Sequence, residues 1–284
     1  MKKTLFAIIA LLLVITACDK MEDTHYVADD TITVDVEFPA LDASSVYRKI
    51  LIEEFTGHKC TNCPSAHDRL KVLLDQSGGS LIAICIHAGY LARTDPPDYP
   101  TDYTTQVGSQ LYTDFGISSV PNAIVNRTQY QNKWGLLPDS WANAIDAIDR
   151  TKVSAAVQII NDYNDSYQRL RTYIKTSMLE DYDESLSLSL SLFLIEEGII
   201  SPQLRGSTRI VDYEHSHVLR LGINGTYGKP LTLDGDLIKD STYSVGYEVR
   251  FANKDWKPEN CYVVAVLINP ATKEVIQVEK CKVK

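Results

Sequence analysis

The residues with the clearest chemistry in this sequence are Cys60 and Cys63, which form a C-x-x-C motif within the segment 57–64. The motif follows an apolar segment and precedes a helical pattern, so Cys60 is expected at a helix N-terminus. There, free N–H groups and the positive end of the helix dipole favour a thiolate. Cys63 lies one turn later, close enough to attack a mixed disulfide formed at Cys60. The motif predicts a dithiol/disulfide couple, with a static structural disulfide as the alternative.

The elements that position this motif alternate between strand and helix from residue 48 to residue 150. Apolar runs and 3.6-residue spacings predict strands at 49–55, 81–86 and 123–126 and helices at 64–74, 109–115 and 141–148. This β-α-β-α-β-α order predicts a mainly parallel sheet with helices on its faces. The segment 89–108 holds three prolines and is expected to be a long loop.

From residue 151 onward the patterns are those of strands. The segment 186–194, LSLSLSLFL, alternates leucine with serine and is predicted to be a half-buried strand. Further strands are predicted at 152–160, 170–178, 217–221, 243–251, 262–268 and 274–283. We therefore expect an α/β plus β chain, in which an α/β domain precedes an antiparallel β-sandwich-like domain.

The segment 50–63 resembles the strand, loop and C-x-x-C of thioredoxin-like proteins. The resemblance implies a thioredoxin-like fold for the first domain, in which Glu54 is the buried carboxylate that assists Cys63. It also implies that Val120-Pro121 is the cis-proline element that receives the substrate backbone. The sequence departs from that family where Lys59 replaces the usual tryptophan and Thr-Asn replaces Gly-Pro between the cysteines.

A metal site is an alternative reading of the same region. His58, Cys60, Cys63 and His67 lie within ten residues, and His87 is expected at the end of the next strand, on the sheet edge where α/β proteins bind ligands. Copper-handling thioredoxin-like proteins also combine a cysteine pair with a distant histidine. The spacing lacks the two-part pattern of a zinc finger, so we predict no resident metal and no cofactor.

The composition limits the class of protein. The 284 residues include 28 Lys and Arg against 37 Asp and Glu, a formal charge of −9 that argues against nucleic-acid binding. The hydrophobic fraction of 44% and the charged fraction of 23% are those of a globular chain. Residues 1–17 have the charged and apolar regions of a secretory signal. The end of that segment, Ile15 to Cys18, resembles a bacterial lipobox, which implies lipidation of Cys18 and anchoring to a membrane.

A narrower resemblance covers most of the remaining chain. The segments 53–64, 86–89, 115–127 and 214–220 are similar to the twenty-eight-kilodalton outer-membrane protein family of lipid-anchored envelope proteins. This resemblance implies a cell-envelope location, in the outer membrane. We divide the chain into a signal peptide (1–17), an acidic tether with a short strand (18–45), a thioredoxin-like domain (46–150) and a β-rich domain (151–284).

The other cysteines and histidines have simpler interpretations. A symmetric hairpin around residues 269–273 would place Cys261 opposite Cys281, which predicts a cross-strand structural disulfide. Cys85 is expected to be an inert thiol in a buried strand. His215 and His217 would share one face of a surface strand, with a metal or ligand site as the alternative.

Two functions remain open at this point. The first is a membrane-tethered thiol–disulfide oxidoreductase in which Cys60 attacks, Cys63 resolves, and Glu54 and Pro121 assist, with cysteine-containing envelope proteins as its partners. The second is a non-enzymatic surface binding or adhesion lipoprotein in which the C-x-x-C disulfide is structural. The tyrosines of the 89–108 loop, Tyr90, Tyr99 and Tyr103, would either line a groove beside Pro121 or pack as part of the surface.

Overall fold

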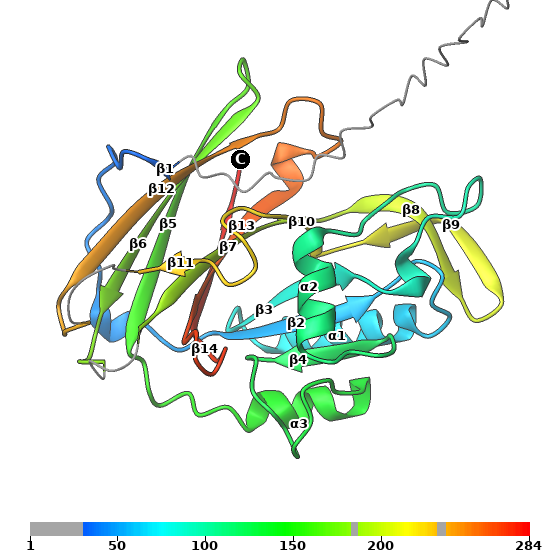
Figure 1. Ribbon diagram of the computed structural model, residues 1–284, viewed down its shortest axis with the longest axis horizontal. Coiled ribbons are helices and arrows are strands. Elements are labelled where there is room, and N and C mark those ends of the chain that lie inside the picture. The colour runs from blue at the N-terminus through cyan, green and yellow to red at the C-terminus, as the bar shows by residue number, and fades with distance from the viewer. Residues whose placement is uncertain (1–30, 183–186, 232–236) are drawn as a thin grey trace, which may run out of the picture.

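The computed structural model describes residues 31–182, 187–231 and 237–284 (Figure 1). The signal segment, Cys18 and the first part of the tether, residues 18–30, lie outside the described residues. The helices are α1 (Cys63–Gln76), α2 (Gln106–Asp114) and α3 (Trp141–Asp146), with 3-10 turns η1 (Ala43–Ser45), η2 (Tyr90–Ala92), η3 (Pro138–Ser140) and η4 (Pro258–Asn260). The strands are β1 (Thr31–Ile32), β2 (Ile50–Thr56), β3 (Leu81–His87), β4 (Asn122–Val125), β5 (Ala155–Asn164), β6 (Arg169–Met178), β7 (Ser189–Glu196), β8 (Ile199–Arg205), β9 (Thr208–His215), β10 (Val218–Gly222), β11 (Lys229–Pro230), β12 (Thr242–Arg250), β13 (Cys261–Ile268) and β14 (Val275–Lys282).

The predicted alternation of strand and helix is confirmed in the first half of the chain. β2 and β3 are parallel, and β4 runs antiparallel to β2. Every residue of β2 and β3 is buried, because α1 and α3 cover one face of these strands and α2 contributes to the core on the other. This double coverage explains why both segments are continuous apolar runs rather than alternating ones.

One sheet joins the two halves of the chain. Its order is β14-β13-β7-β10-β3-β2-β4, with β11 paired to β7. The junction is a parallel pairing of β10 with β3, where the Cys85 N–H donates to the His217 carbonyl at 2.7 Å. The mixed α/β chain dominated by strands agrees with the sequence. The continuity of one sheet across residue 150 was not predicted. The residues around β3 in the sequence give no sign that its free edge pairs with β10, a strand far along the chain.

The two edges of this sheet come together. The Val275 N–H at the start of β14 donates to the Asn126 carbonyl, directly after β4, at 3.1 Å, and the Asn126 amide donates back to the Val275 carbonyl at 2.8 Å. The sheet therefore curls around a core that contains residues of β2, β3, α2, β7, β13 and β14. Among the described residues, no helix combines the length and apolar character needed to cross a membrane.

A second sheet, of order β1-β12-β6-β5, stands at one end of the molecule, and β8 and β9 lie at the opposite end (Figure 1). A separate core joins this sheet to β7 and β13. As a result β7 is buried on both faces, and the expectation of a half-buried strand is wrong. Its leucines face the second sheet, whereas Phe193 and Ile195 face the core beside α2. The predicted strand in the tether is reduced to Thr31–Ile32.

The predicted Cys261–Cys281 disulfide is also wrong, since both residues are free thiols. Cys281 lies opposite Val263, two residues away from the expected register. Ile268 pairs with Val275 rather than with Glu274, which accounts for one residue of the shift, and an irregularity between Leu267 and Ile268 accounts for the other. The alternation of faces resists a shift of one residue but tolerates a shift of two, so it could not fix this pairing.

Candidate functional site

The C-x-x-C segment lies where the sequence placed it, between β2 and α1. Cys60 and Cys63 are joined by a disulfide, with their Cα atoms 5.4 Å apart. The helix begins at Cys63, and the N–H of Cys63 points to the Cys60 Sγ at 3.1 Å. Pro64 occupies the first helical turn, where its missing N–H leaves no helical bond unmade.

A hairpin formed by β8 and β9 covers this disulfide, and the sequence did not predict either strand. The Leu204 N–H donates to the His58 carbonyl at 2.8 Å, and the Gly206 N–H donates to the Thr61 carbonyl at 3.0 Å. The Gln203 amide donates to the Cys60 carbonyl at 3.2 Å. Cys60 and Cys63 are each only 2% exposed. A sulfur must be accessible to exchange with another protein, so this hairpin would have to move before the disulfide could react.

Pro121 follows a cis peptide bond from Val120, as the resemblance to thioredoxin-like proteins implied. It lines an open groove of about 610 Å³ together with Asn62, Ala66 and Leu137. Neither cysteine lines this groove. The structure thus brings Pro121 near the C-x-x-C loop, at Asn62, but neither sulfur reaches the groove that the proline lines.

Glu54 is fully buried in β2, and its contacts go to two residues that the sequence did not connect with it. Its Oε2 lies 3.3 Å from the His67 Nδ1 and 3.3 Å from the Cys85 Sγ. The Cys85 Sγ and the His67 Nδ1 are 3.8 Å apart. We call Glu54, His67 and Cys85 the buried triad. Burial opposes a charge on His67, but the hydrogen bond and the negative charge of Glu54 outweigh it and raise the His67 pKa. Burial, reinforced by Glu54, raises the pKa of the Cys85 thiol.

Aromatic rings gather above the buried triad. His87, at the end of β3 as predicted, has its ring centroid 5.6 Å from that of His215 and 4.9 Å from that of Tyr103. Tyr103 donates its hydroxyl to Ser201 at 2.7 Å. Burial lowers the His87 pKa, and it lowers the His215 pKa to about 4. The two imidazoles are therefore neutral near pH 7.

The outer histidines also take part in this cluster. His58 is buried, stacks on Tyr99 with centroids 5.2 Å apart, and places its Nε2 3.0 Å from the Arg93 carbonyl. Burial lowers the His58 pKa. His217 lies between β9 and β10 with a φ of 58°, so it does not share a strand with His215, and the expected surface strand is wrong. The tyrosines of the 89–108 loop differ in burial, since Tyr103 is buried in the cluster whereas Tyr90 is exposed.

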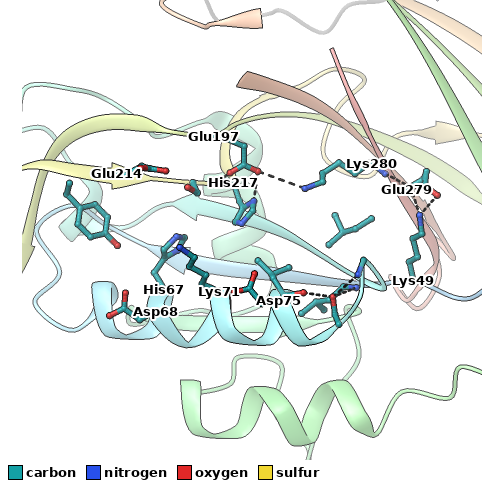
Figure 2. A pocket seen from close by; sticks show the side chains of 17 residues that line it. Lys49, His67, Asp68, Lys71, Asp75, Glu197, Glu214, His217, Glu279 and Lys280 are labelled. Carbon is teal, nitrogen blue, oxygen red and sulfur yellow. Dashed lines mark hydrogen bonds and ion pairs between the residues drawn. The ribbon is translucent and has the colours of Figure 1, made fainter. Parts of the chain in front are cut away.

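A cleft of about 710 Å³ opens beside the buried triad, between α1 and the segments around β9, β10 and β14 (Figure 2). His67 points into it from α1 and His217 points down from the opposite wall, with their ring centroids 6.2 Å apart. The Glu197 carboxylate accepts a hydrogen bond from the backbone N–H of His217 at 2.9 Å. Lysines and acids alternate around the rim, including Lys71, Asp75 and Lys280. Its size is that of a small-molecule site, and its lining suits a polar ligand.

Sequence reasoning also missed a buried ion pair beside Glu54. The Arg127 guanidinium donates to both oxygens of Glu53, at 2.9 and 2.7 Å, and both side chains are almost fully buried. The sequence did contain a signal for it, since two adjacent carboxylates within an apolar strand must find partners when the strand is buried.

Comparisons with known proteins place the chain among envelope proteins. The sequence model of the family described as outer membrane protein Omp28 matches residues 108–284. HBP35 of Porphyromonas gingivalis is similar in structure, with a TM-score of 0.63, 16% identity and coverage of 84% of this chain and 76% of that one. A protein of Agrobacterium tumefaciens gives a TM-score of 0.52 at 12% identity over 84% of this chain and 96% of that one.

A domain of the outer-membrane lipoprotein Omp28 of Porphyromonas gingivalis is 20% identical over 46% of this chain and 89% of that one, with a TM-score of only 0.31. None of the curated proteins compared with the chain matches it. The residues matched by the family model begin after the C-x-x-C motif, so the family match does not bear on the chemistry of that motif.

Proposed function

Because this chain belongs to the Omp28 family of outer-membrane proteins, we propose that it is a lipid-anchored binding protein of the outer membrane whose Cys60–Cys63 disulfide is structural. The observation that carries this proposal is the burial of both cysteines beneath the β8–β9 hairpin. The cleft between α1 and β10 is the proposed binding site, for a small polar ligand. Its mixed lysines and carboxylates favour a ligand that carries both hydrogen-bond donors and acceptors.

The domain division proposed from the sequence fits this function. The order β2-α1-β3-α2-β4-α3 and the cis bond before β4 support a thioredoxin-like domain over residues 46–150. The core between the second sheet and β7 and β13 supports a sandwich-like β-rich domain over residues 151–284. In this arrangement the first domain is a scaffold, and the second supplies one wall of the cleft and the cover of the disulfide.

Thiol–disulfide exchange is the second candidate function. The specific observation that favours it is the position of the disulfide at the start of α1. It requires an opening of the hairpin that exposes the Cys60 Sγ. Glu54 would then have to act on Cys63 from its present contacts with His67 and Cys85.

One experiment separates the two functions. The Cys63→Ala variant leaves Cys60 as a free thiol and is expected to form no mixed disulfides with envelope proteins in cells. The reduction potential of the wild-type pair is expected to lie below about −300 mV, as for structural disulfides of secreted proteins. Adducts that depend on Cys60, and that disappear in the Cys60→Ala/Cys63→Ala double variant, would instead establish the oxidoreductase.

The proposed anchor is tested separately. Replacement of Cys18 by alanine is expected to abolish incorporation of labelled fatty acid and to move the protein from the membrane fraction to the soluble fraction. Several acyl chains are needed for stable attachment, so the loss should be nearly complete. Unchanged membrane attachment of Cys18→Ala would show that another segment holds the protein there.

A further inference from the structure

We propose that Glu54, His67 and Cys85 form a binding site for one divalent transition-metal cation, with Zn²⁺ as the best match to the ligand set. A carboxylate, an imidazole and a thiolate are the ligand types that Zn²⁺ takes in proteins. The three ligand atoms come from β2, α1 and β3, and all lie within 4.8 Å of one another. The sequence predicted no metal here, and its alternative metal site shared only His67 with the buried triad.

The spacing of the three atoms agrees with tetrahedral coordination. Zinc bonds of about 2.0–2.2 Å to nitrogen and oxygen and about 2.3 Å to sulfur place ligand atoms roughly 3.4–3.6 Å apart at tetrahedral angles. The distances in the structure are 3.3 Å for Glu54 to His67, 3.3 Å for Glu54 to Cys85 and 3.8 Å for Cys85 to His67. A cation between them requires shifts of only a few tenths of an ångström.

Unpaired polar atoms around the buried triad are the second observation that points to a ligand. Glu54 is 0% exposed, and its Oε1 has no hydrogen-bond partner among the described residues. His87 is 2% exposed, and neither of its ring nitrogens has a partner there. Buried polar atoms are rarely left in this state unless an ion or a water completes them. A hydrogen-bonded triad alone would leave all of these atoms unsatisfied.

A cavity of about 20 Å³ provides the remaining coordination position. His67 and Cys85 line it, and so do His87 and His215. A volume of roughly 10–15 Å³ is enough for one water molecule, so the cavity holds a single small ligand of the metal. Three protein ligands with one open position are the arrangement typical of zinc sites that interact with a further molecule.

The cleft supplies the route by which a cation reaches this site. His67 lines both the cavity and the cleft, whereas Glu54 and Cys85 lie behind it. Glu197 and Asp68 add negative charge to the cleft near His67 (Figure 2). The sulfurs of Cys60 and Cys63 are bonded to each other and take no part. The metal site therefore stands whether or not the cleft binds an organic ligand and whether or not the disulfide reacts.

Titration of the full chain with Co²⁺ alone, after removal of metals with a chelator, tests the site. Cobalt bound by a thiolate gives a charge-transfer band in the near ultraviolet, which carboxylate or imidazole ligands do not give. We expect this band at about one Co²⁺ per chain, displacement of the cobalt by Zn²⁺, and loss of the band in Cys85→Ser. The affinity for Zn²⁺ should fall by about tenfold or more in His67→Ala and Glu54→Gln.

Two matched variants control for loss of any thiol or carboxylate. Cys281→Ser removes a free thiol outside the buried triad, and Glu248→Gln removes a largely buried carboxylate on β12. Both should retain the band and the affinity. Absence of the band in the wild-type protein would overturn the proposal without reliance on any variant, as would a band that persists in a folded Cys85→Ser. Both results leave the disulfide experiments unaffected.

Discussion

Two sulfur-containing regions lie side by side in this protein, and they differ in what can reach them. The Cys60–Cys63 disulfide is covered by the β8–β9 hairpin, which donates hydrogen bonds to four backbone carbonyls of the C-x-x-C loop. Cys85 belongs to the buried triad, whose His67 reaches the wall of an open cleft. All three sulfurs are buried, but the buried triad reaches an open cleft through the side chain of His67, whereas the disulfide has no such contact with the cleft.

A motif identifies a type of chemistry but not whether the reacting atoms are accessible. The C-x-x-C spacing fixes only the distance between two sulfurs. A hairpin about 140 residues further along the chain decides whether another molecule meets them. Substitutions can change either β2, which both regions share, or the residues around each sulfur that distinguish the two regions.

The largest effect is expected from loss of the Arg127–Glu53 ion pair. This pair holds β2, the strand that carries Glu54 and leads into the C-x-x-C loop. Arg127→Met leaves the Glu53 carboxylate buried without its partner, next to Glu54, and should destabilise the protein by about 3–5 kcal/mol. Chemical denaturation measures this loss. Arg69→Met removes an exposed contact with Asp139 and should cost less than about 1 kcal/mol. Equal effects of the two variants would mean that the buried pair does not stabilise β2.

The second prediction concerns acid sensitivity near the buried triad. The pKa of His215 falls from 6.5 to about 4 on folding because burial disfavours its charged form. The unfolded chain therefore binds more protons in this window, and stability present above pH 6.5 is lost as the pH falls toward 4. The loss is roughly 3 kcal/mol for a shift of this size.

Denaturation of the chelator-treated protein between pH 7 and pH 4 measures this effect. His87, Tyr103 and Tyr213 face His215. The His215→Phe variant should show a flatter dependence of stability on pH. Tyr213→Phe is the matched control, since the Tyr213 pKa is raised to about 12 by burial and this group does not titrate in the window. His87 and His58, whose pKa values are also lowered by burial, account for the dependence that remains. A dependence in His215→Phe as steep as in the wild-type protein would contradict the assignment.

The third prediction tests the cover of the disulfide. Gln203→Ala removes the amide that donates to the Gly57 and Cys60 carbonyls, and should cost about 1–2 kcal/mol. It should also accelerate reduction of the disulfide by a small thiol, because the hairpin opens more often. Arg209 lies elsewhere on the hairpin and pairs with Asp98 of the 89–108 loop. The Arg209→Ala variant should leave the rate of disulfide reduction unchanged. Equal rates in wild type and Gln203→Ala would show that the hairpin does not limit access.

The smallest effect is expected at Cys281. Cys281 is a free thiol and is partly exposed. Its replacement by serine should therefore change the free energy of unfolding by less than about 0.5 kcal/mol. In the native protein Cys281 should react with a thiol reagent, whereas the buried Cys85 and Cys261 should react only after unfolding. A loss of several kcal/mol in Cys281→Ser, or an unfolded chain in which Cys85 reacts but Cys261 and Cys281 do not, would contradict the assignment of Cys261 and Cys281 as free thiols.

Elements that depend on local interactions were predicted correctly, whereas elements that depend on long-range contacts were not. Local patterns predicted β2, α1, β3 and β4 to within a few residues. Apolar runs and helical periodicity depend only on residues that are close together in the sequence. The β8–β9 hairpin was missed since its residues alternate weakly, and its partners belong to the C-x-x-C loop. The Cys261–Cys281 pairing failed because the turn and one irregularity in the strands each displaced the register by one residue.

The sequence by itself determined the order of the elements, the C-x-x-C at the start of a helix and the envelope family, because each depends on residues close together in the chain. Only the tertiary structure decided that the disulfide is covered and that Glu54, His67 and Cys85 meet. These contacts depend on the parallel pairing of β2 with β3, the packing of α1 on both, and the addition of β10 to the β3 edge. Such pairings depend on the burial of whole faces, which no local spacing in the sequence specifies.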